Sequence, residues 1–114
     1  MDNLVVQIIS QTASEQIKAL RSRKVSAVDL LEATIERAES LIPHLNPFAL
    51  TLYARARQSA QEADRKLADG TGGKLCGLPV TIKDSQFLAG YPCANGSHAL
   101  KDFIPSETCR AIEL

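Results

Sequence analysis

The sequence lacks the features that mark several large classes of protein. Its 114 residues include no apolar run of bilayer length, so no membrane partner is expected. The first residues, Met1-Asp2-Asn3, carry no basic stretch of the kind that begins a signal peptide. The 13 basic residues are balanced by 13 acidic ones, so the composition favours no nucleic acid as partner. We therefore expect a cytoplasmic chain.

The cysteines lack the spacing of a disulfide framework or a zinc site. Cys76, Cys93 and Cys109 are an odd number and form no CxxC pair. Cys93 and His98 together would supply only two metal ligands, which do not make a site. The glycine cluster at 70–73 follows a predicted helix rather than a strand, and no GK[ST] accompanies it, so it is not a phosphate-binding loop. We expect neither a metal nor an organic cofactor.

Two capping boxes predict the first helices. Thr12 with Glu15 predicts a helix from about Ala13 to Arg23, and Ser26 with Asp29 predicts the next one. In each box a hydroxyl accepts a hydrogen bond from an amide that has no partner inside the helix. Apolar residues at spacings of three and four follow both boxes, as in an amphipathic helix.

Further elements are predicted on either side of these helices. Residues 3–10 are too short a run to assign, and both a frayed helix and an edge strand fit them. Pro43 and Asn46-Pro47 are expected to end the second capped helix. A long helix is predicted over Tyr53–Ala68, with an alanine-rich inward face, and the glycine cluster ends it. Ser106 predicts a helix that begins at Glu107.

Two segments predict short strands, Phe48–Leu52 and residues 78–83. In the second segment aliphatic residues alternate with others, which places Lys83 on the face opposite the aliphatic side chains. A lysine at the end of a core strand is costly to bury. Lys83 is therefore either functional or a structural lysine that reaches water and pairs with Asp84 or a distant carboxylate.

The predicted sheet has too few strands to cover the aliphatic faces of the predicted helices and of the 78–83 segment. The last predicted helix also reaches the end of the sequence after about two turns. We therefore expect a piece of a larger α/β protein. It divides into a helical region at about 1–45, a strand-helix-strand region at about 46–90, and a loop with a truncated helix at 91–114.

The chain resembles the amidase signature family over nearly its whole length. The most specific match is Gly77-Leu78-Pro79-Val80-Thr81-Ile82-Lys83-Asp84, which is similar to the family's Gly-[Ile/Leu]-Pro-x-x-x-Lys-Asp segment. Weaker matches in the expected order are Leu20 to Leu31, Leu45-Asn46-Pro47-Phe48-Ala49, Ala89-Gly90, Gly96-Ser97, Ala99-Leu100 and Phe103-Ile104-Pro105. The resemblance implies the N-terminal fragment of the amidase signature fold, with several helices packed on a small incomplete sheet.

The resemblance also implies a chemistry. In this family a serine attacks the carbonyl of a linear amide, and a second serine on a cis peptide relays its proton to a neutral lysine, so that a carboxylic acid and an amine are formed. Lys83 matches the catalytic lysine. Both family serines belong to a Gly/Ser-rich segment that this sequence lacks, and we expect Ser97 and Ser85 to be turn and loop residues. The 114-residue chain alone is therefore predicted to be inactive.

The expected partner of the complete enzyme is a small-molecule amide. The segment Cys93-Ala94-Asn95-Gly96 differs from the cysteine-rich stretch of the tRNA amidotransferase branch, which favours a stand-alone hydrolase of small amides. The alternative is a non-catalytic interaction or assembly module derived from an amidase, with the amphipathic region from Leu4 to Leu41 as its surface. Exposed apolar faces of such a fragment favour self-association.

Overall fold

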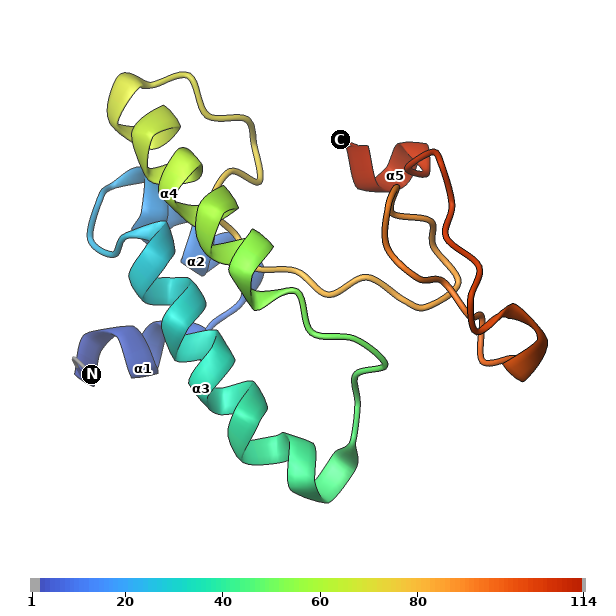
Figure 1. The fold of residues 1–114 in the computed structure, drawn as a ribbon. Coiled ribbons are helices and arrows are strands. Elements are labelled where there is room, and N and C mark those ends of the chain that lie inside the picture. Colours follow the sequence, from blue (N-terminus) through green and yellow to red (C-terminus); the bar gives the residue numbers. More distant parts are fainter. Residues whose placement is uncertain (1–2, 114) are drawn as a thin grey trace. The chain divides into compact units, whose positions relative to one another are not determined.

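The computed structural model describes residues 3–113, which divide into two compact units. The first unit ends at Pro79 and contains the four helices α1 to α4. The second unit begins at Val80 and consists of turns, the 3-10 turn η1 (His98–Leu100) and the short helix α5 (Arg110–Glu113) (Figure 1). Regular structure is therefore concentrated in the first unit.

Two short helices open the first unit, α1 (Asn3–Ile9) and α2 (Ala13–Arg21). The first apolar run, for which helix and strand were both open, is helical. The predicted capping box is confirmed: Thr12 Oγ1 accepts from the Glu15 amide at 3.3 Å, and Glu15 Oε2 accepts from the Thr12 amide at 2.9 Å. Hydrogen bonds from the Thr12 side chain and backbone hold the pKa of Glu15 below its ordinary value.

The helix α3 (Ala27–Leu45) begins at the second predicted cap. The Asp29 amide donates to Ser26 Oγ at 3.0 Å. Of the two predicted stops, Asn46-Pro47 is confirmed and Pro43 is wrong, since α3 continues to Leu45 and ends at Asn46 in the left-handed conformation, with φ of 43°. A proline removes one backbone donor, but so close to the helix end the chain stays helical for the two residues that remain.

The helix α4 (Tyr53–Asp69) confirms the prediction of a long helix with an alanine-rich face. It lies along α3 (Figure 1), and Ala60 and Ala63 are buried against the core. Small side chains at these positions let the two helices approach closely. The helix ends at Gly70, whose φ of 71° is the left-handed conformation that glycine adopts without strain. The alanine-rich face of α4 thus packs against another helix, α3.

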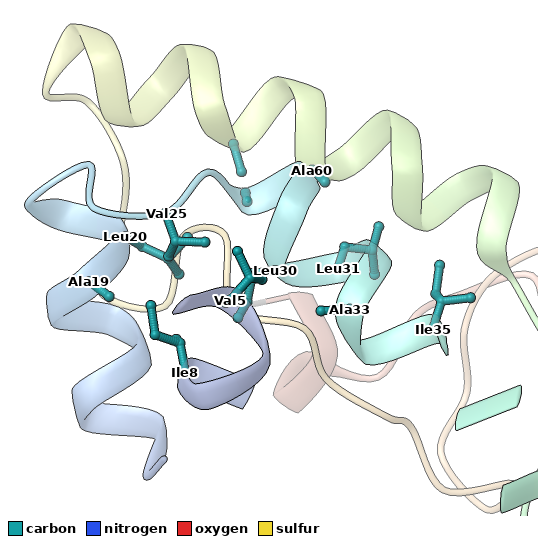
Figure 2. Packing of buried hydrophobic residues seen from close by; sticks show 12 residues of the cluster. Val5, Ile8, Ala19, Leu20, Val25, Leu30, Leu31, Ala33, Ile35 and Ala60 are labelled. Atoms are coloured by element: carbon teal, nitrogen blue, oxygen red, sulfur yellow. The ribbon is translucent and has the colours of Figure 1, made fainter. Parts of the chain in front are cut away.

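The core of the first unit lies between these helices. Ile8, Leu20 and Leu30 are its fully buried large side chains among the described residues, and they lie together where α1, α2 and α3 meet (Figure 2). Every buried member of this cluster is aliphatic: Val5, Ile8, Ala19, Leu20, Val25, Ala27, Leu30, Leu31, Ala33, Ile35, Ala60 and Ala63. Apolar burial therefore stabilises the helical unit.

A carboxylate from α4 caps the start of α3. Asp64 Oδ1 accepts from the Ala27 amide at 2.6 Å, and its Oδ2 accepts from the Val28 amide at 3.2 Å. These are two of the amides that a helix leaves without an internal partner at its first turn. A negative charge there also complements the positive end of the helix dipole. The contact joins segments that lie 37 residues apart in the sequence.

We expect Asp64→Ala to lower the free energy of unfolding of the chain by about 1–3 kcal/mol, because two partly buried amides lose their acceptors. Urea unfolding followed by the far-ultraviolet circular dichroism of the helices measures the change. Gln61→Ala on the exposed face of α4 is the matched control and is expected to change stability by less than about 0.5 kcal/mol. Equal effects of the two substitutions would contradict this account of the cap.

The predicted strands are absent between residues 3 and 113, so the small sheet is a wrong prediction. Phe48–Leu52 is a loop, and residues 79–83 run without regular structure. A strand exists only through hydrogen bonds to a neighbouring strand. Within the described part of the chain, the backbone of residues 79–82 makes no hydrogen bond. The alternation of side chains therefore indicated an extended segment, but it could not show whether a second strand lies beside that segment.

The second unit is held by backbone hydrogen bonds between distant turns. The Gly90 amide donates to the Pro105 carbonyl, and the Cys93 amide donates to the Phe103 carbonyl, each at 3.0 Å. The rings of Phe87 and Phe103 meet edge to face, with centroids 5.5 Å apart. The prediction of a helix from Glu107 is wrong, because α5 begins only at Arg110.

The reason for this later start lies in the same set of contacts. The Cys109 amide donates to the Phe87 carbonyl at 2.9 Å, and Thr108 Oγ1 accepts from the Ala89 amide at 3.0 Å. Residues 108 and 109 are thereby engaged with another turn.

None of the helices between residues 3 and 113 has the length and apolar character needed to cross a bilayer.

Candidate active site

The segment that leads to the predicted catalytic lysine begins at a glycine packed against the helical core. Gly77 has a φ of 85°, and a Cβ there would lie 3.1 Å from the Cβ of Ala27 and 3.3 Å from Leu67 Cδ1. Both the left-handed backbone and the close contacts favour glycine. The Leu78 amide then closes a turn onto the Leu75 carbonyl at 3.1 Å. The first residue of the motif thus has a structural role.

Lys83 lies near the start of the second unit and is exposed. Its side chain makes no hydrogen bond or ion pair with any residue of the described part. The structural alternative is therefore seen in part: Lys83 reaches water, but it pairs with neither Asp84 nor a distant carboxylate within residues 3–113. Val80 is 71% exposed and Ile82 is 36% exposed, so these aliphatic residues do not bury the lysine in this chain.

The next residue, Asp84, is anchored on a turn ten residues later in the sequence. Its carboxylate accepts from the Ala94 amide at 3.2 Å and from the Gly96 amide at 3.4 Å. Its main-chain carbonyl accepts from the Asn95 amide at 3.0 Å and from the Cys93 thiol at 3.4 Å. Sequence reasoning missed this anchor, because amides of a turn carry no side-chain pattern by which a distant partner is found.

The turn that receives Asp84 has the backbone that its residues favour. Asn95 and Gly96 have φ values of 49° and 69°, the left-handed backbone that asparagine and glycine favour in turns. Cys93 is buried, with 3% of its surface exposed, and so fixes the entry of the turn. Ser97 closes the turn by donating its amide to the Ala94 carbonyl at 2.9 Å.

The remaining candidate residues have local roles. Ser97 Oγ accepts from the Ala99 amide at 3.3 Å and caps η1, as expected of a turn residue. Ser85 lies in the turn that the Gln86 amide closes onto the Lys83 carbonyl at 2.9 Å. In the part of the chain that the structure describes, no three side chains of His, Cys, Asp or Glu gather in a way that could hold a metal ion.

Comparison with known proteins finds relatives for most of the chain. The profile of the family described as Amidase matches residues 29–114. A glutamyl-tRNA(Gln) amidotransferase subunit of Gluconobacter oxydans is 41% identical over 87 residues, which cover 76% of this chain and 18% of that protein. An indoleacetamide hydrolase of Bradyrhizobium diazoefficiens is 38% identical over 98 residues, which cover 84% of this chain and 19% of the hydrolase.

The corresponding amidotransferase subunit of Geotalea daltonii is 33% identical over 100 residues, which cover 88% of this chain and 21% of that protein. The chain thus spans about a fifth of the length of the curated relatives that it matches. The family match includes Lys83, Asp84 and the turn on which Asp84 is anchored. With these matches over most of its length, the chain belongs to the amidase signature family.

Proposed function

We propose that the complete protein carrying this segment hydrolyses linear C–N amide bonds to a carboxylic acid and an amine, with Lys83 as the base. The family match over residues 29–114 carries this proposal, since it spans the lysine motif. Relatives named as a hydrolase of an amide and as subunits of an amidotransferase support amide chemistry. The region at Cys93–Gly96 still favours a small amide over a tRNA-linked one.

The proposed mechanism assigns Lys83 one step in the transfer of a proton. A serine oxygen attacks the amide carbonyl while its proton passes through a second serine to the neutral lysine amine. The lysine returns this proton through the second serine to the substrate nitrogen, so that the C–N bond breaks and a neutral amine leaves. Water then attacks the acyl-enzyme and gives its proton to the lysine by the same relay, and the carboxylic acid is released as the proton returns to the serine oxygen. A lysine acts as a base only in its uncharged form, which a water-poor surrounding favours. Both serines and that surrounding come from sequence beyond residues 1–114 in this proposal.

We expect the complete protein to release aniline or a related amine from a simple aryl amide, while the isolated 114-residue chain releases none. The reason is that the chain supplies one of the three members of the triad. The measurement is amine release at equal molar concentrations, with an ester as a further substrate.

Two outcomes would count against this proposal. Turnover by the isolated chain that disappears in Lys83→Ala would show that the triad proposed here is wrong. A reading frame that stops at residue 114, with a chain that self-associates in sedimentation experiments, would favour the assembly module instead. A continuing frame with a Gly/Ser-rich segment supports the amidase.

A further inference from the structure

We propose that Asp84 is a positioning residue for Lys83, and that it acts by anchoring the backbone of the lysine on the turn at residues 93–96. This inference rests on the proposed function, in which Lys83 receives the proton. Asp84 makes four contacts with that turn, two through its carboxylate and two through its main-chain carbonyl. The side chain of Lys83, its neighbour, makes no hydrogen bond or ion pair within residues 3–113.

The anchor restrains the lysine because the two residues share a peptide bond. Consecutive Cα atoms are held about 3.8 Å apart, so fixing Asp84 by both its carbonyl and its carboxylate limits where the Lys83 Cα can lie. The lysine side chain itself is a flexible four-carbon stem. Among the described residues, the backbone at Lys83 and Asp84 thus determines where the lysine side chain begins. An error of about 1 Å in the position of a catalytic group lowers the rate by roughly a hundredfold.

The receiving turn is suited to act as a fixed point. Asn95 and Gly96 both adopt left-handed backbone conformations, and amides on either side of Asn95 reach the Asp84 carboxylate. The buried Cys93 is held from the other side by the hydrogen bond from its amide to the Phe103 carbonyl. The turn is therefore tied to the rest of the second unit by a contact other than those with Asp84.

The same contacts determine where the negative charge of Asp84 is directed. A carboxylate paired with a lysine favours the charged amine, which cannot accept a proton. The Asp84 oxygens instead accept hydrogen bonds from the Ala94 and Gly96 amides, and no ion pair joins Asp84 to Lys83 in the described part. The acid therefore contributes an anchor beside the lysine without acting as its counter-ion.

The test uses the complete enzyme and compares Asp84→Ala, Asp84→Asn, Lys83→Ala and the control Asp102→Asn. Asp102 is an exposed acid of the same unit with no hydrogen bond or ion pair inside residues 3–113. The measurements are kcat, KM and the midpoint of thermal unfolding. Exhaustive labelling of the nucleophilic serine with a fluorophosphonate counts the active molecules, so that kcat is expressed per active molecule.

We expect Asp84→Ala to lower kcat per active molecule by about tenfold to a hundredfold, with KM within about twofold of the wild-type value. Asp84→Asn keeps one acceptor oxygen for two amides, so its kcat is expected to fall between alanine and the wild type. Asp102→Asn is expected to behave as the wild type. A purely structural role of Asp84 would instead reduce the number of active molecules and leave each with wild-type kcat.

The failures of the two proposals are distinguishable. Wild-type kcat in Lys83→Ala would overturn the proposed function itself. Loss of activity in Lys83→Ala together with wild-type kcat per active molecule in Asp84→Asn and Asp84→Ala would overturn the positioning role alone. If Asp84→Ala does not fold, Asp84→Asn decides: a severalfold loss of kcat at unchanged KM supports the anchor, and wild-type kcat overturns it.

Discussion

Replacement of Lys83 by alanine in the complete enzyme is expected to lower kcat by several orders of magnitude and to leave the fold intact. In the proposed mechanism no other group receives the proton of the relay, and removal of a residue that acts as part of a catalytic unit costs on the order of a thousandfold or more. The side chain is exposed and makes no hydrogen bond or ion pair within residues 3–113, so its truncation is expected to change stability little.

The measurement is the hydrolysis of an aryl amide under saturating substrate, with circular dichroism and thermal unfolding as checks of the fold. Lys101→Ala is the matched control, because Lys101 is an exposed lysine of the same unit outside the motif. It is expected to retain wild-type kcat. Retention of wild-type kcat by Lys83→Ala as well would refute the assignment of the base.

Leu30→Ala is expected to lower the free energy of unfolding of the helical unit by about 2–5 kcal/mol. Leu30 is fully buried, at 0% exposure, where α1, α2 and α3 meet (Figure 2). Its truncation leaves a cavity among aliphatic neighbours drawn from three helices, and these helices cannot all relax toward one another at once. A loss of this size is a large part of the stability of a small domain.

Urea unfolding of the 114-residue chain, followed by circular dichroism, measures this effect. Leu45→Ala provides a control with the same chemical change in the same helix, since Leu45 lies at the end of α3 and is 66% exposed. The control is expected to change stability by less than about 0.5 kcal/mol. A similar loss in both variants would contradict the location of the core.

The helices could be predicted from the sequence because their signals are local. The capping residues Thr12 and Ser26 lie within three positions of their partners, and the alanine face of α4 repeats at helical spacing. Strands could not be settled in this way, since pairing depends on segments far away in the chain. The same limit explains why the helix expected from Glu107 begins only at Arg110. Thr108 and Cys109 make hydrogen bonds with Ala89 and Phe87, which the local pattern does not reveal.

The site shows the same division between local and distant information. Lys83 could be proposed as a site residue because it lies in a motif of eight consecutive residues, and the family match includes it. The geometry beside it depends on amides at Ala94 and Gly96, whose position reflects backbone conformation. Asn95-Gly96 indicated a left-handed turn, but nothing in those residues indicated which carboxylate the turn would bind.

The boundary between the two units falls inside the motif, after Pro79. Its glycine is favoured by close contacts with Ala27 and Leu67, whereas the side chain of its lysine makes no hydrogen bond or ion pair in the described chain. Selection on this short stretch therefore has two separate targets. Substitutions at Gly77 are expected to lower the amount of folded protein, whereas under the proposed function substitutions at Lys83 are expected to lower the activity of each folded molecule.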